Sequence, residues 1–544
     1  MLAGILACVA GVALPAVHAQ APAVAALAQS PAVAALAQAP AVAARPAAEV
    51  VEDRWYRLSL GGQPCGWFHD ALEREGDVYR SITETEMTVG RMGQGVTIRT
   101  RTQFEESVRG EPLRAVIRKD SGAAPVTSTW TFGPGGIDIV EEQAGRRTTQ
   151  HRPLPPAGWL APRAADEFVR HRLASGAKEL RYVTLDPESG PEAVAVQSVL
   201  KGQAQAQLDG RTVSVTEWST KTSLMERPST EWIASDGVLV RSSTDLGVGM
   251  LESMLTTRMA ATAKVAPVEV MARTFIMLTS DGRALSGSRR AELAMRATDG
   301  TLSEIPSAGA QVFTRTGTGS ATVTVDADAG SVASEADRAD PRFTRASVMA
   351  DGDDPAIRAI AEKALAGCAP LPLARAEALR SAVFRHISRK NLASGFATAS
   401  EAAKSKAGDC TEHAVLLCAL LRTQGIPARV GSGLLYVPEA GGIRNAYGWH
   451  MWTQAIIDGK WIDLDAVLPP DGPRFDASHL LTGWSAADGA SLDTDLARIV
   501  DLMGDTEIDV RSINGKPVAV SATAPATAPA TAPAAGAPPS GKPR

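Results

Sequence analysis

The first half of the chain alternates hydrophobic and polar residues with a period of two, which is the pattern of half-buried strands. Four segments show the alternation best: 96–100, 127–132, 211–216 and 238–241. Turns rich in Gly, Pro and Asp separate them, and one helical pattern covers 165–173. The pattern predicts an extended antiparallel sheet with one helix over residues 49–265. Two similar halves are one form that such a sheet could take, but the sequence shows no clear repeat.

The pattern changes after this region. A small β segment and linker is predicted over 266–345, with its best strands within 268–277 and 320–325 and a solvated stretch after them. Helical patterns then resume. Asp354 followed by Pro355 is a favourable helix start, because proline fits the first helical position.

A buried helix is predicted to begin at Cys410. Asp409 followed three residues later by Glu412 is a capping-box pattern, which makes Asp409 the N-cap and Cys410 the first helical residue. The run 414–421 is apolar on every face, so the helix is expected to be buried. The positive end of the helix dipole favours a thiolate at Cys410, and the backbone N–H groups there are candidates to stabilise an oxyanion. Cys418, on the same helix, is interpreted as core packing, which is also the alternative for Cys410.

A β-hairpin follows. Asp458-Gly459 lies between two hydrophobic runs, which is a strong signal for a two-residue type I′ turn. Such a turn fixes the register of the two strands, so that Ile457 faces Lys460.

This register selects the partner of His450. Trp452 then faces Asp465, and His450 lies on the same face as Asp465, a diagonal neighbour roughly 7–8 Å away at the backbone. Asp463 shares the face, but it pairs with Gln454 and lies one step further from His450. Cys410, His450 and Asp465 therefore form a candidate nucleophile, base and orienting carboxylate for acyl transfer through a thioester.

Three sequence motifs carry a resemblance to a known family. They are Gly-Asp-Cys-Thr-Glu-His-Ala at 408–414 running into Gly-Ile-Pro-Ala-Arg at 425–429, Gly-Trp-His-Met-Trp at 448–452, and Trp-Ile-Asp-Leu-Asp at 461–465. The stretch from about Asp354 to Leu481 resembles the transglutaminase-like superfamily, which has a papain-like core. The resemblance implies that Cys410 is the nucleophile, His450 the general base and Asp465 the residue that orients His450. It also implies a cysteine helix packed against an antiparallel sheet.

The superfamily includes peptidases, amidases, cross-linking transglutaminases and inactive copies, so the resemblance does not fix the reaction. We expect a hydrolytic enzyme acting on a protein or peptide, because water is the default acceptor of the acyl group. A cross-linking transglutaminase and a non-catalytic binding protein are the alternatives. Trp449 and Trp452 are predicted to line the substrate pocket, with packing of the hairpin as the other interpretation.

Charge and cysteine usage exclude several other classes. The formal net charge is −5 over 544 residues, which gives no electrostatic footprint for nucleic acid. The spacing of Cys410, His413 and Cys418 does not suit a zinc site, and no phosphate loop or dinucleotide fingerprint occurs. We therefore predict no metal and no cofactor. The sequence does not determine the oligomeric state.

The first residues have the character of a signal peptide. Residues 2–17 are apolar or small, and Val17-His18-Ala19 suits a signal peptidase, although no Lys or Arg precedes them. The run is too short for a good membrane span, so no span is expected in the mature chain. We expect export to the periplasm or the exterior of the cell.

The expected fold class is α+β, a C-terminal transglutaminase-like (papain-like) domain preceded by β-rich antiparallel domains. The predicted units are a signal peptide (1–19), an Ala- and Pro-rich linker (20–48), a β-rich domain (49–265), the small β segment and linker (266–345), the catalytic domain (346–520) and a disordered Ala-, Thr- and Pro-rich tail (521–544).

Overall fold

The computed structural model describes most of the chain between its two low-complexity ends. The described residues are 48–91, 94–120, 125–143, 145–208, 210–270, 273–298, 300–390, 397–440, 442–487, 502 and 506–519. The expected signal segment, all but the last residue of the Ala- and Pro-rich linker, and the C-terminal tail lie outside these residues. None of the helices within the described ranges combines the length and apolarity needed to cross a membrane.

The first half of the chain forms one large antiparallel sheet. Its strands are β1 (Glu49–Leu60), β2 (Gln63–Glu75), β3 (Val78–Arg91), β4 (Gln94–Ser107), β5 (Pro112–Asp120), β6 (Val126–Gly133), β7 (Gly136–Gln143), β8 (Arg146–Arg152), β9 (Glu179–Leu185), β10 (Ala193–Leu208), β11 (Arg211–Thr222), β12 (Met225–Ala234), β13 (Leu239–Asp245) and β14 (Met250–Thr256). Strands β1 to β8 follow one another across the sheet, β9 to β14 do the same, and β1 pairs with β14 where the two runs meet. The predicted antiparallel sheet is confirmed.

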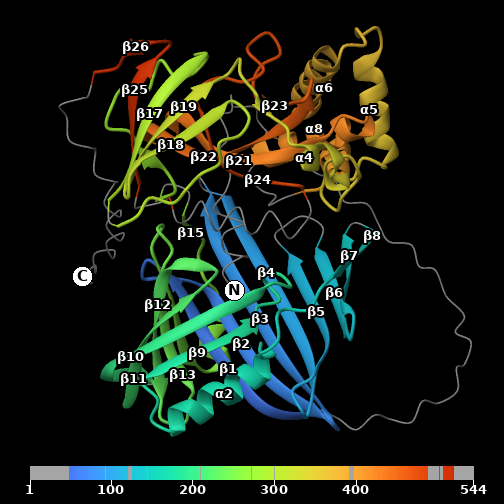
Figure 1. The fold of residues 1–544 in the computed structure, drawn as a ribbon. Coiled ribbons are helices and arrows are strands. Elements are labelled where there is room, and N and C mark those ends of the chain that lie inside the picture. Colours follow the sequence, from blue (N-terminus) through green and yellow to red (C-terminus); the bar gives the residue numbers. More distant parts are fainter. Residues whose placement is uncertain are drawn as a thin grey trace, which may run out of the picture.

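The large sheet is strongly curved, and helix α2 (Pro162–Ala174) lies across its lower end (Figure 1). Strand alternation places one set of side chains inside, as in β1, where Tyr56, Leu58 and Leu60 are buried. The helix predicted near 165–173 is present, and a short helix α3 (Arg258–Ala261) follows β14.

A second, five-stranded sheet combines two distant parts of the chain. Its strands are β17 (Arg290–Ala297), β18 (Gln311–Gly317), β19 (Ser320–Asp326), β25 (Thr506–Ile513) and β26 (Lys516–Pro517), in the order β18-β19-β17-β25-β26. The small β segment is thus completed by strands that come after the candidate catalytic residues. The described residues of 268–277 form two short strands, β15 (Val268–Glu269), which pairs with β3, and β16 (Ile276–Met277).

The C-terminal half contains a third sheet and most of the helices. Its sheet is built from β20 (Ser331–Val332), β21 (Ala428–Ala440), β22 (Ile443–Ile457), β23 (Lys460–Leu464) and β24 (His479–Ser485), with β16 paired to β22. The helical elements are α4 (Glu335–Ala339), the 3-10 turn η2 (Pro341–Phe343), α5 (Pro355–Leu365), α6 (Pro372–His386), α7 (Ala399–Ser405) and α8 (Cys410–Thr423). The helices lie on one side of this sheet and the five-stranded sheet lies on the other side (Figure 1). The α+β class is confirmed.

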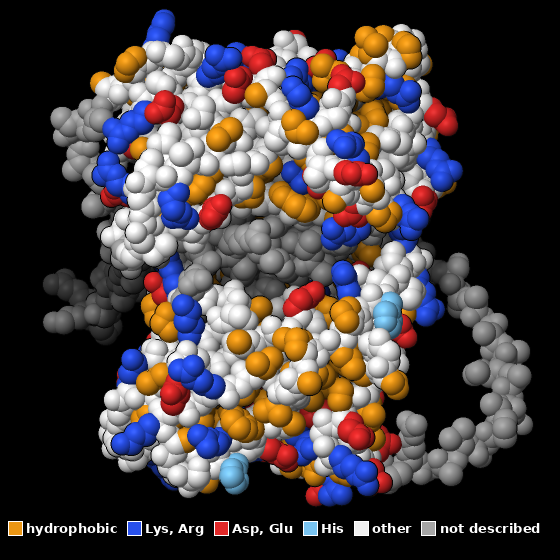
Figure 2. Space-filling view, in the orientation of Figure 1, with side chains coloured by type: hydrophobic (Ala, Val, Ile, Leu, Met, Phe, Trp, Pro, Cys, Tyr) orange, Lys and Arg blue, Asp and Glu red, His pale blue; other side chains and the backbone are white. Residues whose placement is uncertain are grey.

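The large sheet packs against the C-terminal half through a continuous hydrophobic core. One buried cluster contains Leu58 and Val89 of the large sheet together with Leu416 of α8 and Trp449 of β22. An ion pair of 2.8 Å between Arg146 and Asp353 also links the two parts. The face in Figure 2 mixes Lys and Arg with Asp and Glu and carries no large patch of one sign on the described residues in view.

Candidate active site

Helix α8 begins as its sequence predicts. Asp409 is the N-cap, its Oδ1 accepts a hydrogen bond of 2.9 Å from the Thr411 N–H, and Glu412 Oε2 accepts one of 2.8 Å from the Asp409 N–H. Position 408 has room only for glycine beside Glu412, because a Cβ at this position would lie 2.4 Å from the Glu412 Cβ. The capping box therefore fixes Cys410 as the first helical residue, where only 2% of its surface is exposed.

The same cap uses two of the backbone N–H groups named above as candidates to stabilise an oxyanion. Asp409 accepts hydrogen bonds from the backbone N–H groups of both Thr411 and Glu412, so these two groups serve the helix cap. Burial and the neighbouring Asp409 carboxylate raise the pKa of Glu412. Its second oxygen accepts a hydrogen bond of 2.9 Å from the Ala397 N–H, which ties α8 to the chain before α7.

The hairpin has the predicted turn and register. Asp458 and Gly459 have φ angles of 51° and 77°, as a type I′ turn requires. Ile457 pairs with Lys460, and Gln454 pairs with Asp463. The two-residue turn and the resulting face assignment are confirmed.

The structure brings His450 and Asp465 together. His450 Nε2 lies 3.0 Å from Asp465 Oδ2, and each side chain is 1% exposed. The other oxygen of Asp465 accepts a hydrogen bond of 2.8 Å from the Val467 N–H, which fixes the orientation of the carboxylate. Burial alone would raise the pKa of Asp465, but the attraction and hydrogen bonds of the two imidazoles beside it, His450 and His479, lower it instead.

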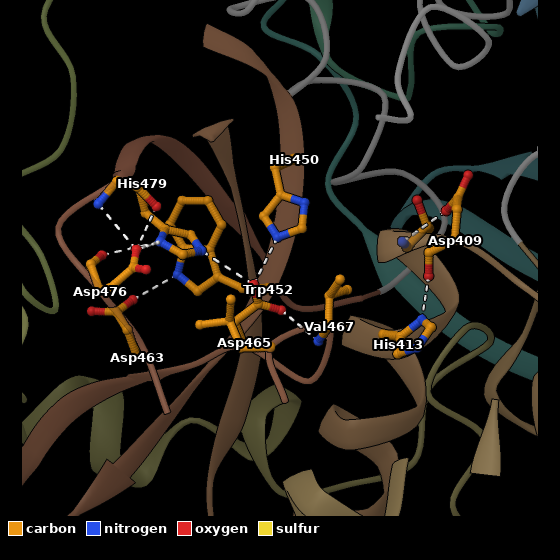
Figure 3. Close-up of polar contacts among 12 residues, drawn as sticks. Asp409, His413, His450, Trp452, Asp463, Asp465, Val467, Asp476 and His479 are labelled. Carbon is orange, nitrogen blue, oxygen red and sulfur yellow. Dashed lines mark hydrogen bonds and ion pairs between the residues drawn. The ribbon is translucent and has the colours of Figure 1, made fainter. Parts of the chain in front are cut away.

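Cys410 lies in the same buried cluster as Trp449 and Ala466, which are the residues next to His450 and Asp465. Helix α8 is tied to β22 by a hydrogen bond of 2.9 Å from Thr453 Oγ1 to the Ala414 carbonyl. The buried Nδ1 of His450 has no hydrogen-bond partner among the described residues. Figure 3 shows this edge of the ring on the side where Asp409, the N-cap of α8, lies. An imidazole held at one nitrogen and open at the other is what a cysteine–histidine pair needs.

His479 and Asp476 also belong to this site, although neither is among the site residues predicted from the sequence. His479 begins β24, and its Nε2 lies 3.2 Å from the same Asp465 oxygen that His450 contacts. Its Nδ1 lies 3.0 Å from the Asp476 carbonyl oxygen and 3.2 Å from Asp476 Oδ1. Burial alone would lower the pKa of His479, but its hydrogen bonds to Asp465 and Asp476 raise it to about 10. Figure 3 shows the resulting chain Asp476–His479–Asp465–His450.

Asp463 does not contact His450 and serves a different network. Its Oδ1 accepts hydrogen bonds of 2.7 Å from Trp452 Nε1 and from Gln454 Nε2, and its Oδ2 accepts one of 2.7 Å from the Ala310 N–H. The choice of Asp465 over Asp463 as the partner of His450 agrees with these contacts.

The structure places both predicted pocket tryptophans inside the fold. Trp452 and Trp449 are each 1% exposed, Trp452 against the five-stranded sheet and Trp449 in the cluster that contains Cys410. These positions account for packing, and a contact with substrate stays a prediction for both residues.

His413 lies one turn from Cys410, and its side chain is bonded to the cap of α8. Its Nδ1 donates to the Asp409 carbonyl at 2.6 Å, and burial lowers its pKa to about 4, so the ring is neutral near pH 7. This bond anchors His413 to the helix cap and not to Asp465.

Arg380 of α6 was not singled out by its sequence context either. Its buried guanidinium donates to the backbone carbonyls of Asp465 at 3.2 Å and Leu468 at 2.8 Å. Burial lowers the pKa of Arg380. Through these hydrogen bonds Arg380 holds the backbone of the loop that begins at Asp465, and it thereby helps to position the Asp465 carboxylate.

One group of side chains in the described part of the chain has the donor types for a metal ion. Donor atoms of His450, Asp465 and His479 lie within 4.8 Å of one another. However, hydrogen bonds from His479 to both carboxylates require a proton on each ring nitrogen, which leaves no lone pair for a metal. We therefore assign this group to hydrogen bonding.

Comparison with protein families gives one match. The model of the transglutaminase-like superfamily matches residues 358–466, a range that contains Cys410, His450 and Asp465. The resemblance seen in the three sequence motifs is confirmed for this domain. No curated protein matches the chain.

Three solved structures are similar to parts of the chain. A β-barrel-like protein of unknown function from Brucella abortus has 12% identity and a TM-score of 0.30, over 37% of this chain and 94% of its own. A candidate cysteine protease from Cytophaga hutchinsonii has 14% identity and a TM-score of 0.25, over 46% of this chain and 89% of its own. A candidate protease from Parabacteroides distasonis has 11% identity and a TM-score of 0.18, over 66% and 68%. Scores this low support no functional conclusion.

Proposed function

We propose that this chain, whose residues 358–466 match the transglutaminase-like superfamily, is an exported cysteine-dependent enzyme that hydrolyses peptide or carboxamide bonds. The observation that carries the proposal is the state of His450. Its Nε2 is held by Asp465 at 3.0 Å, while its Nδ1 is buried without a hydrogen-bond partner among the described residues. Cys410 lies in the hydrophobic cluster that flanks both residues.

In the first half of the reaction, the Cys410 thiolate attacks the carbonyl carbon of the substrate. A C–S bond forms, and the C–N bond breaks as the His450 imidazolium gives its proton to the leaving amine. The products of this step are a thioester on Cys410, a free amine and a neutral His450. Asp465 fixes the ring during the transfer, because its hydrogen bond to Nε2 leaves Nδ1 as the reacting nitrogen.

In the second half, neutral His450 accepts a proton from the attacking nucleophile. When water attacks, the C–S bond breaks, a carboxylic acid leaves and the thiolate–imidazolium pair is restored. When an amine attacks the same thioester, the product is an amide and the enzyme is a transglutaminase. We assign hydrolysis, because water needs no dedicated binding site.

The near-complete burial of the site has a consequence for catalysis. Cys410, His450 and Asp465 are between 1% and 2% exposed, so charges in the site are poorly screened by water. Hydrogen bonds and charge pairs in such a site are stronger than in water.

Alkylation of the full chain by iodoacetamide across pH tests whether Cys410 is activated. We expect Cys410 to react well below the pH of an ordinary thiol, whose pKa is about 8.5, and His450→Ala to abolish this low-pH reaction. Cys418 is the internal control, because it is buried on the same helix and burial raises its pKa. If Cys410 reacts no faster than Cys418, the chain is a binding protein and the enzyme proposal is wrong.

A second experiment determines the acceptor of the acyl group. The protein is incubated with peptide libraries in the presence of a fluorescent primary amine, beside Cys410→Ala. We expect cleaved peptides that contain a new carboxylate and depend on Cys410. Covalent incorporation of the amine without cleavage would identify a cross-linking transglutaminase instead. Export is tested separately, by locating the chain after fractionation of the cells that produce it.

A further inference from the structure

His479 is a fully buried histidine that lies between two carboxylates. It has no exposed side-chain surface, and its two ring nitrogens face two different carboxylates, Asp465 and Asp476. Phe475 covers the ring with a centroid separation of 4.2 Å, and Trp452 meets it edge-on at 5.2 Å. A fully buried imidazole between two carboxylates needs a positive charge to balance them.

Asp476 is itself fixed as an anion. Its Oδ1 accepts hydrogen bonds from the backbone N–H of Ser478 at 3.1 Å and from the Ser478 hydroxyl, and its Oδ2 accepts one of 2.7 Å from the Gly287 N–H. Burial alone would raise the pKa of Asp476, but the hydrogen bonds from His479 and Ser478 lower it. The negative end of the chain is therefore permanent, and it holds the proton on His479 Nδ1.

The proposed catalytic cycle changes the charge of His450, and Asp465 needs a positively charged neighbour throughout the cycle. While His450 is an imidazolium, Asp465 has a charged partner. Once His450 has given its proton to the leaving amine, Asp465 would be a buried carboxylate facing a neutral ring, which is unfavourable in an apolar site. His479 donates to the same oxygen, Asp465 Oδ2, at 3.2 Å and can supply the missing charge.

We propose that His479 is a positioning residue, a permanent imidazolium that keeps Asp465 ionised and oriented while His450 gains and loses its proton. The proposal rests on the proposed function and adds a residue to its machinery. Because His479 shares the charge of Asp465, it also weakens the hold of Asp465 on the proton of His450. His450 then releases its proton more readily in the first half of the reaction and is available as a base in the second.

Other charged groups face this chain, and none replaces His479. Arg380 donates to the backbone carbonyl of Asp465, and Lys390 and His413 act on Asp465 only through space. Arg289 interacts through space with Asp476 and donates to the Phe475 carbonyl at 2.8 Å. Burial raises the pKa of Asp463, and the charge of His479 acts in the opposite direction. The side chain that contacts both carboxylates is His479.

The direct test is the protonation state of His479 in the intact full-length protein. The chain has 8 histidines, so their ring signals can be resolved by NMR and assigned with single His→Gln variants. We expect the His479 ring to carry protons on both nitrogens throughout pH 6–9. A neutral His479 at pH 7 overturns the proposal, whatever the activity of Cys410.

The second test measures the effect of His479 on His450. In His479→Gln we expect hydrolysis of the acyl-enzyme at pH 7 to slow about tenfold, so that the thioester accumulates, since a positive neighbour of Asp465 is lost. We also expect the pH profile of this step to move to higher pH by about one unit. Asp476→Asn should give a smaller change in the same direction. An unchanged pH profile of acyl-enzyme hydrolysis in His479→Gln overturns the proposal.

Controls separate this inference from the function on which it rests. His386→Gln removes a half-buried histidine of α6 that contacts the Ala403 carbonyl at 2.7 Å, and it should change neither quantity. A Cys410 that is never reactive refutes the enzyme, while a reactive Cys410 with an unchanged pH profile in His479→Gln refutes only the role of His479. Stoichiometric zinc that is bound by the native protein and lost in His479→Gln would identify a metal site and also overturn the proposal.

Discussion

Two of the Asp–His pairs in the described part of the chain have similar contacts in opposite surroundings. On the large sheet, His151 Nδ1 lies 2.8 Å from Asp138 Oδ1, and the two side chains are 58% and 68% exposed. In the C-terminal half, His479 Nδ1 lies 3.2 Å from Asp476 Oδ1, and the two side chains are 0% and 5% exposed. In both pairs the aspartate raises the pKa of the histidine.

The comparison shows that a short contact does not by itself make an ion pair important. Water solvates His151 and Asp138 whether or not they meet, so little is gained by their contact. His479 and Asp476 have no such alternative, because removal of either residue would leave the other as a buried charge that water cannot solvate. The longer of the two contacts is therefore the one on which the fold depends.

The largest expected effect is on activity, and it comes from substitution of Asp465, the second carboxylate that His479 contacts. Asp465→Asn keeps the shape of the side chain but removes the charge that holds His450 Nε2. We expect kcat/KM for peptide hydrolysis to fall about 10³-fold or more, because His450 loses its orientation and its stabilised imidazolium. The measurement is steady-state hydrolysis of a peptide selected in the library screen.

Asp138→Asn is the matched control for this activity, and it should leave kcat/KM unchanged. A loss of activity in Asp465→Asn no larger than in the control would mean that the carboxylate does not act in the reaction.

The next effect is on stability. Asp476→Ala leaves the His479 imidazolium buried with one of its two carboxylate partners missing. We expect the free energy of unfolding to fall by about 3–5 kcal/mol, the usual result of breaking a buried pair by removing one side. Urea unfolding followed by tryptophan fluorescence measures the change. A loss below about 1 kcal/mol, typical of exposed pairs, would show that burial does not separate the two pairs.

The pH dependence of stability gives a smaller effect. The pKa of His479 is about 10 in the folded protein, whereas a histidine without these interactions has a pKa of 6.5. Because the folded-state pKa is raised, the stabilisation is fully present below about pH 6.5 and is lost as pH rises through about 10. We expect the urea midpoint to decrease steadily between these values in the native protein, and less steeply in His479→Gln. Equal slopes in the two proteins would contradict a charged His479.

Local sequence signals predicted much of this site. The capping box of Asp409 and Glu412 and the turn at Asp458-Gly459 each depend on residues close in the chain, and both are present. The turn then determined the strand register, which was sufficient to choose Asp465 as the partner of His450.

The parts of the site and fold that the sequence did not predict depend on contacts between segments that are distant in the chain. His479 reaches Asp465 because β24 pairs with β21 on the far side from β23, and no local pattern specifies that order. One weak signal is present: Asp476, Ser478 and His479 lie within four positions, and Asp476 makes local hydrogen bonds to Ser478. Likewise, β25 joins the five-stranded sheet from more than 150 residues beyond β19, which strand propensity alone does not indicate.

The smallest expected effect belongs to the exposed pair. Asp138→Ala removes the hydrogen bond that chiefly raises the pKa of His151, so this pKa should fall toward its ordinary value, as measured by NMR. The urea midpoint should not change, because both side chains are solvated in the folded and unfolded chain. The variant thus separates the local titration of a histidine from the stability of the fold. A decrease in midpoint comparable to that of Asp476→Ala would mean that this edge of the large sheet depends on its charges, and that solvent exposure is not what distinguishes the two pairs.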